Sequence, residues 1–292
     1  MSPGRHLVVG ATGQVGGALL RHLRERGIPA LGTGFRRAAE ISVDLGDPAA
    51  LHALLESVRP DVVLLTAAFT HVDGCERNPA LSRRVNFEGP AAVSAWAAAH
   101  GAQVVFYSTD YVFDGRNGPY SEDDPAHPLS RYGADKRLAE EAVLALGARG
   151  LVLRTAWVYS WETAPQNFMQ RLALNLAAGQ TARVPDDQWG NPTYAPDLAR
   201  ATLDLLAAGA SGLIHAAGPR TMTRAAFARL IAETFGLPAD RVIGVSTQSL
   251  GQTAPRPLQA GMKVERLRGL LGWVPCPPES VLPDLARAHP LA

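Results

Sequence analysis

A tyrosine and a lysine four residues apart are the side chains of this sequence best suited to acid–base chemistry. Tyr132 and Lys136 lie in the segment Pro-Leu-Ser-Arg-Tyr-Gly-Ala-Asp-Lys. On a helix this spacing places both side chains on one face, one turn apart. A phenol has an ordinary pKa of about 10, and an adjacent ammonium group lowers it by favouring the phenolate. Such a pair can protonate a carbonyl oxygen as a hydride arrives, or take the proton back in reverse.

The same spacing also occurs on solvated helices, so this interpretation depends on a second feature, a glycine-rich turn near the start of the chain. Gly10, Gly13 and Gly16 follow a short apolar run and precede a helical pattern. Glycines let backbone amides approach a pyrophosphate at a helix N-terminus, where the helix dipole favours negative charge. The first gap is one residue wider than in the best-known dinucleotide motif. An ordinary glycine turn is the alternative, and the flanking strand and helix favour a dinucleotide site.

Two arginines follow the second predicted strand, where an adenosine ribose is expected. An NAD-dependent enzyme usually has an acidic residue there, whereas an NADP-dependent enzyme accommodates the 2′-phosphate with arginine. Arg36 and Arg37 occupy this place, and no acidic residue occurs before Glu40. We therefore expect NADPH as the cofactor, with NADH as the alternative. The competing interpretation is that both arginines are simply solvated residues of a loop.

Composition sets limits on the kinds of partner. The 292 residues include 28 basic and 27 acidic side chains, which argues against nucleic acid or an anionic membrane as a partner recognised by charge. No apolar run approaches the roughly 20 residues of a membrane span, and the start of the chain lacks a signal-peptide pattern. Cys75 and Cys276 are too few for a disulfide framework. We expect a soluble, cytoplasmic protein.

Strands and helices alternate through the first half of the sequence. We expect strands at 7–10, 30–35, 62–68, 103–108 and 151–154. Helices are expected at 18–26, 90–100 and 132–146, and a further helix at 48–58 should begin at the cap Asp47 and the first-turn proline Pro48. This alternation predicts an α/β fold of the Rossmann type, a doubly wound parallel sheet.

The second half of the sequence is less regular and richer in proline. Helical patterns occur at 167–178, 195–207 and 223–235, with a short strand at 212–216. We expect residues 1–156 to form a dinucleotide-binding domain and residues 157–292 to form mainly a smaller substrate-binding region over the strand ends. The boundary is approximate, and the chain can cross it more than once.

Seven segments in order resemble the extended short-chain dehydrogenase/reductases, and more narrowly the dTDP-4-dehydrorhamnose reductase family. They are the glycine loop, Val43-Asp-Leu, Thr66-Ala-Ala-Phe-Thr-His-Val-Asp, Tyr107-Ser-Thr-Asp-Tyr-Val-Phe-Asp-Gly, Tyr132-Gly-Ala-Asp-Lys, Arg154-Thr-Ala-Trp-Val-Tyr and Val184-Pro-Asp-Asp-Gln-Trp-Gly-Asn-Pro-Thr. The resemblance covers residues 6 to 275. Two positions depart from it. Thr66 replaces a common asparagine, and Met262-Lys263 replaces the usual Leu-Asp in a region that helps to build the nucleotide-sugar pocket.

The resemblance implies a role for each matching residue. Thr109 would bind the substrate carbonyl, Tyr132 would donate the proton, and Lys136 would lower the tyrosine pKa and hold the nicotinamide ribose. Asn86 would support a proton relay, with a structural hydrogen bond as the alternative. Substrate contacts are implied for Thr70, Tyr111 and Trp157. Cofactor contacts are implied for Gly10, Thr12, Gly13, Gln14, Val15, Gly16, Asp44, Leu45, Ala67, Ala68, Phe69, Tyr132 and Lys136, beside Arg36 and Arg37.

The expected function is reduction of the 4-keto group of a nucleotide-linked 6-deoxyhexose by NADPH, without a catalytic metal. A dehydratase is disfavoured, because Asp110 is followed by Tyr111 and not by a second acid. An epimerase of the same superfamily remains an alternative, since it uses the same Tyr–Lys pair. A non-catalytic NADP-binding subunit, of the type associated with methionine adenosyltransferase, is a second alternative. A homodimer is compatible with the sequence, which does not fix the oligomeric state.

Overall fold

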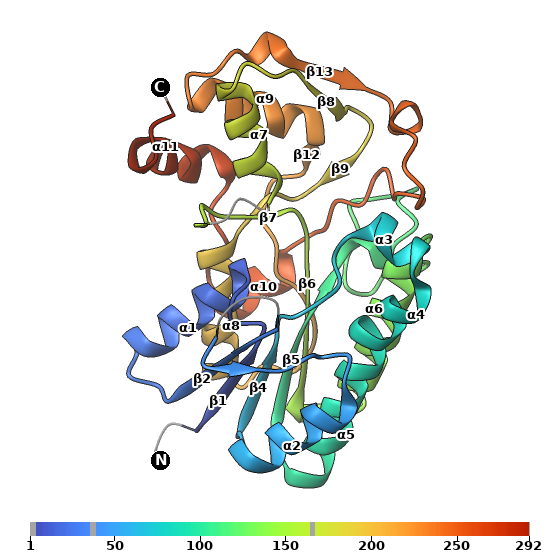
Figure 1. Cartoon of the computed structure of the whole chain (residues 1–292), viewed down its shortest axis with the longest axis vertical. Coiled ribbons are helices and arrows are strands. Elements are labelled where there is room, and N and C mark those ends of the chain that lie inside the picture. Colours follow the sequence, from blue (N-terminus) through green and yellow to red (C-terminus); the bar gives the residue numbers. More distant parts are fainter. Residues whose placement is uncertain (1–3, 36–38, 164–166, 292) are drawn as a thin grey trace.

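A parallel sheet of seven strands, in the order β11-β6-β5-β4-β1-β2-β3, forms the centre of the larger part of the molecule (Figure 1). The computed structural model describes residues 4–35, 39–163 and 167–291. The strand order reverses at β1, as in a doubly wound sheet, and the predicted fold is confirmed. The strands are β1 (His6–Val9), β2 (Ala30–Gly34), β3 (Ile41–Ser42), β4 (Val62–Leu65), β5 (Gln103–Thr109), β6 (Gly150–Thr155) and β11 (Gly212–His215).

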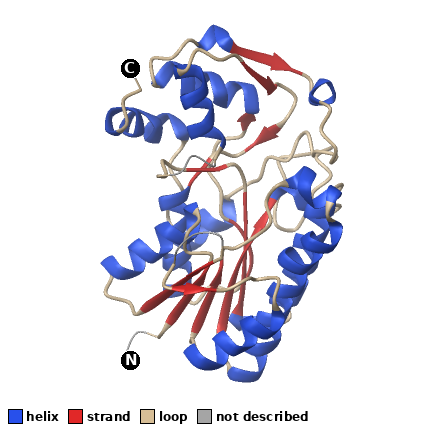
Figure 2. Cartoon of the chain, viewed as in Figure 1, coloured by secondary structure: helices blue, strands red, loops and turns tan. Residues whose placement is uncertain are grey.

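Helices cover both faces of this sheet, as the apolar strands require (Figure 2). On one face, Leu7 and Val9 of β1 pack in a cluster with Leu51 and Leu55. On the other face, Val8 packs in a second cluster. The first face is covered by α2 (Pro48–Val58), α5 (Gly89–His100) and α6 (Arg131–Leu144), and the second by α1 (Gln14–Glu25), α8 (Ala195–Ala207) and α10 (Glu265–Leu271).

Two helix starts are fixed by side-chain caps. Asp47 accepts hydrogen bonds from the backbone nitrogens of Ala49 and Ala50, at 3.0 and 3.1 Å, so the predicted start of α2 is confirmed. Ser130 caps α6 by accepting from the nitrogen of Gly133 at 3.2 Å. Because α6 begins at Arg131, Tyr132 lies in its first turn.

The segment between β4 and α5 is helical, although no helix is expected there from the sequence. Its short pieces are α3 (Val72–Arg77), α4 (Pro79–Arg83) and a π-helical turn at Arg84–Glu88. Asn78 caps α4, with the nitrogen of Leu81 donating at 3.2 Å. Single 3-10 turns lie at Asp110–Val112, Gly147–Arg149, Ala239–Arg241 and Thr247–Leu250.

A smaller C-terminal part has its own apolar core. Its helices are α7 (Phe168–Ala177), α9 (Arg224–Thr234) and α11 (Pro278–Ala288), and in Figure 1 they lie together above the sheet. Three two-stranded ladders complete it. They pair β7 (Val158–Tyr159) with β10 (Thr193–Tyr194), β9 (Trp189–Gly190) with β12 (Met222–Thr223), and β8 (Ala182–Pro185) with β13 (Val242–Val245).

The chain crosses between the two parts more than once. After the first ladders it returns to the sheet through α8, which packs against α1, and through β11, which pairs in parallel with β6. It then crosses again to form α9 and β13. The strand expected at 212–216 therefore belongs to the central sheet. None of the helices within the described ranges combines the length and apolar character that a membrane crossing needs.

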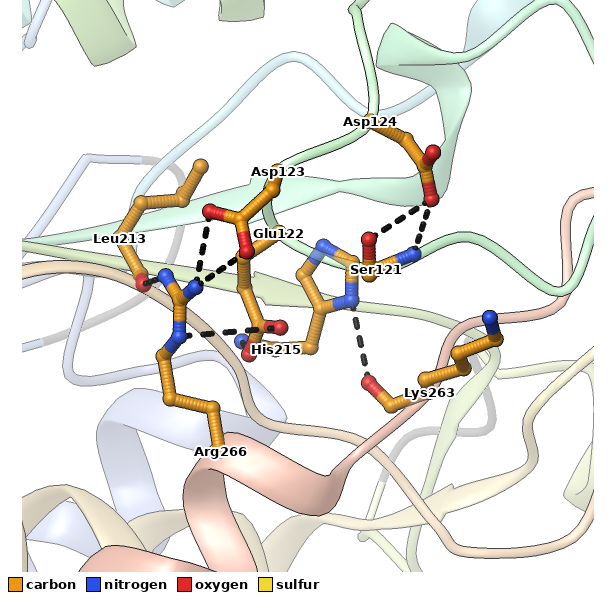
Figure 3. Close-up of polar contacts among 8 residues, drawn as sticks. All are labelled: Ser121, Glu122, Asp123, Asp124, Leu213, His215, Lys263 and Arg266. Atoms are coloured by element: carbon orange, nitrogen blue, oxygen red, sulfur yellow. Dashed lines mark hydrogen bonds and ion pairs between the residues drawn. The ribbon is translucent and has the colours of Figure 1, made fainter.

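A polar cluster fixes the long loop between β5 and α6 against the C-terminal half of the chain (Figure 3). Glu122 accepts a hydrogen bond from the backbone nitrogen of His215 at 2.9 Å. Arg266 donates to both carboxylate oxygens of Asp123, at 2.9 and 2.8 Å. The ring Nδ1 of His215 donates to the carbonyl of Lys263 at 3.1 Å, and burial lowers the pKa of this histidine to about 3. His215 therefore stays uncharged at neutral pH, and the cluster is structural.

We expect Glu122→Ala to lower the free energy of unfolding by about 1–3 kcal/mol, because it leaves the buried backbone N–H of His215 without its partner. Asp123→Ala is the matched control. Its side chain is 82% exposed, so the change should stay within about 0.5 kcal/mol. Urea unfolding of the two variants measures both values, and equal destabilisation would contradict this assignment.

Candidate active site

A cavity of about 760 Å³ lies at the carboxyl ends of the central strands, with α7 and α9 on its opposite wall. In a doubly wound sheet this edge is where ligands bind. The predicted catalytic, cofactor-binding and substrate-binding residues that the structure describes line it, whereas Asn86 does not. They are Gly10, Thr12, Gly13, Gln14, Val15, Gly16, Asp44, Leu45, Ala67, Ala68, Phe69, Thr70, Thr109, Tyr111, Tyr132, Lys136 and Trp157.

The glycine loop is a close-packed cradle. Gly10 has a φ of +96°, and a Cβ on it would lie 2.6 Å from the backbone nitrogen of Ala67. A Cβ on Gly16 would lie 2.2 Å from the carbonyl oxygen of Gly10. Gly13 is the N-cap of α1 and has no side chain to accept hydrogen bonds from the first backbone N–H groups of the helix. These groups face the cavity, at the carboxyl end of β1. This geometry fits a dinucleotide pyrophosphate.

The adenosine end of the cavity is only partly described. Asp44 and Leu45 line it beside Phe35, and the carboxylate of Asp44 accepts from the nitrogen of Gly46 at 2.8 Å. Arg36 and Arg37 lie outside the described residues. The preference for NADPH that they suggest therefore stays a prediction.

Thr109, Tyr132 and Lys136 converge from two elements. Thr109 ends β5, and the other two lie on successive turns of α6. A Cβ on Gly133 would lie 2.1 Å from the carbonyl oxygen of Tyr111, so only glycine lets the first turn of α6 approach the end of β5. The three residues are 6%, 9% and 2% exposed, and the Thr109 hydroxyl opposes part of the burial effect by lowering the pKa of Tyr132.

Burial sets the direction of the Tyr132 pKa in this structure, and the lowering effect expected from Lys136 stays a prediction. Burial raises the pKa of Tyr132 above its ordinary value, and the Asp110 carboxylate raises it further. The Lys136 ammonium donates instead to the carbonyl oxygen of Tyr107 and lies 3.8 Å from the ring centroid of Phe106. Burial lowers the pKa of Lys136 to about 7. The loss of water around both groups outweighs the attraction assumed from their spacing.

Asn86 makes structural hydrogen bonds. Its amide accepts from the nitrogen of Phe69 at 2.9 Å and donates to the carbonyl of the same residue at 3.1 Å. These bonds fix the loop that follows β4 and lines the cavity. They match the alternative of a structural hydrogen bond for Asn86, and its role in a proton relay stays a prediction.

Aromatic side chains and arginines form the wall opposite the glycine loop. Trp157 has a φ of +46°, and a Cβ on Gly190 would lie 2.4 Å from its ring, so the indole rests directly on the backbone of β9. The guanidinium of Arg224 lies 4.3 Å from the ring centroids of both Trp157 and Phe168. Trp157 therefore forms the cavity wall as well as packing against its neighbours.

Sequence reasoning missed Arg224, Arg171 and Asp110 as cavity residues. Within the described residues, Nη1 of Arg224 is buried without a hydrogen-bond partner. Burial lowers the pKa of Arg224 to about 10, so it remains charged at neutral pH. The arginines lie far from the recognised motifs in sequence and carry no local signal. Asp110 directly follows Thr109, so its position beside a predicted site residue is a signal that could have identified it.

The Met262-Lys263 departure lies outside the cavity lining. Met262 is 2% exposed and packs with Val112, Phe113 and Tyr120. Its backbone nitrogen donates to Asn191 at 2.8 Å. Arg256, six residues before Met262, is paired with Asp73 at 3.1 Å. In the described part of the chain, no cluster of three His, Cys, Asp or Glu side chains is placed to hold a metal ion.

Comparisons with known proteins match nearly the whole chain. Residues 4–289 match the family model described as RmlD substrate binding domain. The chain is 34% identical over 288 residues to a probable low-salt glycan biosynthesis reductase, Agl14, of Haloferax volcanii, covering 96% of this chain and 95% of that protein. It is 38% identical to a dTDP-4-dehydrorhamnose reductase of Mycobacterium tuberculosis, covering 86% of this chain and 82% of the relative.

The fold is also similar to solved structures. A dTDP-4-dehydrorhamnose reductase from Bacillus anthracis, in complex with NADP, superposes with a TM-score of 0.89 at 26% identity. The match covers 98% of this chain and 100% of that one. The parallel sheet and the smaller C-terminal part therefore recur together in a relative that holds this dinucleotide.

We expect Gly16→Ala to raise the Kd for NADPH at least about tenfold, since the new methyl group must displace α1 from the carbonyl of Gly10. Gly17→Ala is the control on the same helix. Its Cβ would meet the nearest atom at 3.4 Å, an ordinary contact, and alanine suits a helix interior. Fluorescence titration with NADPH compares the two, and equal affinities would refute the role of the cradle.

Proposed function

The chain belongs to the RmlD substrate binding domain family of NAD(P)-dependent reductases, and we propose that it reduces the 4-keto group of a nucleotide-linked 6-deoxyhexose with NADPH. The reaction is of the type that converts dTDP-4-dehydro-L-rhamnose to dTDP-L-rhamnose. One observation supports it most directly. Thr109, Tyr132 and Lys136 line the same cavity as the glycine cradle and the arginine wall.

The residues present fit the cofactor. The cradle of Gly10, Gly13 and Gly16 would hold the pyrophosphate, and Lys136 would contact the nicotinamide ribose. Arg36 and Arg37 would bind a 2′-phosphate, which is the basis for preferring NADPH over NADH. When bound, NADPH supplies the hydride.

The proton comes from this chain. Because the pKa of Tyr132 is raised, its phenol stays protonated across the neutral range. It can therefore transfer its proton to the carbonyl oxygen as negative charge develops there. Thr109 donates a hydrogen bond to the same oxygen, and burial of both groups strengthens this stabilisation.

The arginine wall supports an anionic, nucleotide-linked substrate. Arg224 offers a buried nitrogen with no protein partner among the described residues, and Arg171 lines the same cavity. Guanidinium groups bind phosphate oxygens through two parallel hydrogen bonds. A diphosphate placed here would leave the sugar between Trp157 and Tyr132, toward the centre of the cavity. The identity of the base and of the sugar is part of the proposal and rests on the named relatives.

The first experiment supplies dTDP-4-dehydro-L-rhamnose, generated in place, and follows NADPH oxidation with product analysis. We expect one NADPH to be consumed for each 4-hydroxy sugar formed. An isomeric keto sugar formed without net NADPH consumption would indicate an epimerase. Tight NADPH binding with no turnover of any keto sugar, together with co-purification of a larger partner, would indicate a regulatory subunit.

We expect Tyr132→Phe to lower turnover about 100-fold or more, because it removes the proton donor while keeping the ring. Cofactor binding should stay close to that of the wild type, since the ring still fills its place beside Tyr111. The same assay measures turnover, and NADPH titration provides the control. Turnover retained in the variant would refute the assignment of the acid.

We expect Arg224→Gln to raise KM for the nucleotide sugar about tenfold or more, with a smaller change in kcat, because binding of the diphosphate contributes equally before and during reaction. Arg229→Gln is the matched control, since Arg229 lies on the same helix, is exposed and does not line the cavity. Steady-state kinetics of both variants test this. An unchanged KM in Arg224→Gln would place the diphosphate elsewhere.

A further inference from the structure

Asp110 is a buried carboxyl group that lines the cavity and has no role in the proton transfer proposed for Tyr132 and Thr109. It begins the 3-10 turn at Asp110–Val112 and is 3% exposed. Among the described residues no arginine or lysine lies within ion-pair distance of it. Its Oδ1 is 3.0 Å from the hydroxyl oxygen of Thr109. A buried carboxylate without a paired cation is costly, so its protonated form is favoured.

The hydroxyl of Thr109 has one hydrogen and two acceptor positions. The backbone nitrogen of Tyr111 donates to this oxygen at 3.2 Å and occupies one acceptor position. An ionised Asp110 can only accept, so it would take the single hydrogen of Thr109. Thr109 could then not donate to a substrate carbonyl. A protonated Asp110 can donate to the remaining acceptor position, and this leaves the hydrogen of Thr109 free to point into the cavity.

The groups that face Asp110 come from three elements. Arg224 of α9 favours the carboxylate, whereas Tyr132 of α6 and Tyr111 of the same turn are uncharged phenols. Burial is the largest influence and raises the pKa of Asp110 to about 7, against the opposing effects of Thr109 and Arg224. The protonated form therefore predominates below that pH and is lost above it. Arg256, Asp73 and Cys75 act on the two tyrosines from further away.

We propose that Asp110 is a positioning residue that, in its protonated form, donates a hydrogen bond to Thr109 and so directs the Thr109 hydroxyl at the substrate carbonyl. This inference rests on the proposed function, because it assumes a carbonyl at that place. It adds a role for the acid of the Thr-Asp-Tyr segment, which acts only through Thr109. Asp110 transfers no proton to the substrate in this arrangement.

The test combines Asp110→Asn, Asp110→Ala and Thr109→Val in a double-mutant cycle. The asparagine amide can donate to Thr109 and cannot ionise. Asp110→Asn should therefore keep turnover within about threefold of the wild type at pH 6. Asp110→Ala should lose roughly 10–100-fold in kcat, in the range of a lost oxyanion donor. Once Thr109 is valine, adding Asp110→Ala should cost nothing more.

The pH profile gives a second result. Wild-type kcat should fall as pH rises through about 7, and the part of this fall caused by Asp110 should be missing in Asp110→Asn. Lys136 loses its charge over the same pH range. The effect of Asp110 is therefore the difference between the kcat profiles of the wild type and Asp110→Asn. A profile identical in both proteins would overturn the proposal. So would an Asp110→Asn variant as slow as Asp110→Ala, or losses that add in the double variant.

An infrared measurement keeps the proposal testable if a variant does not fold, and it needs no substrate. Wild-type enzyme with carbon-13-labelled aspartate should show the C=O band of a buried protonated carboxyl at pH 6, and the band should diminish above pH 8. Its absence at pH 6 would overturn the proposal. Failure of the proposed function is distinguishable, because the wild type would then show this band and no turnover of any keto sugar.

Discussion

A buried ion pair joins β6 to α6, the helix that carries Tyr132 and Lys136. Glu140 and Arg154 meet through two hydrogen bonds of 2.8 Å, with side chains 0% and 2% exposed. Tyr132, Lys136 and Glu140 follow one another at intervals of four, so they share one face of α6. Holding Glu140 against β6 turns that face to the sheet and brings Tyr132 to the end of β5. Losing either partner would leave an uncompensated buried charge, which typically costs about 3–5 kcal/mol.

The same exclusion of water that fixes α6 also sets the protonation states in the cavity. Burial lowers the pKa of Lys136 to about 7 and raises that of Asp110 to about 7, while Tyr132 stays a neutral phenol. Because Lys136 and Asp110 change protonation state over the same pH range, the net charge of the site is sensitive to small changes in its surroundings. Desolvation, more than any single neighbour, is the common physical cause.

Local signals in the sequence predicted the parts of the site that depend on nearby residues. The glycine cradle, the cap Asp47 and the Tyr132–Lys136 face follow from spacing within one turn or one loop, and the structure has them where expected. The return of β11 to the sheet could not be read in this way, because a short apolar strand fits either part of the chain equally well. The rise in the Tyr132 pKa could not be read from the sequence either, since spacing along a helix says nothing about burial by other elements.

The opposite wall shows why chemistry was easier to predict than specificity. Trp157, Arg171 and Arg224 come from β6–β7, α7 and α9, and they meet only because the chain crosses between its two parts. Each is held by contacts with residues distant in sequence, as Trp157 is by Gly190. Thr109, Tyr132 and Lys136 instead project from the end of β5 and the first turns of α6, whose relation is fixed by the fold. The wall can therefore vary without disturbing β5 or α6, and under the proposed function this is where we expect the identity of the sugar to be determined.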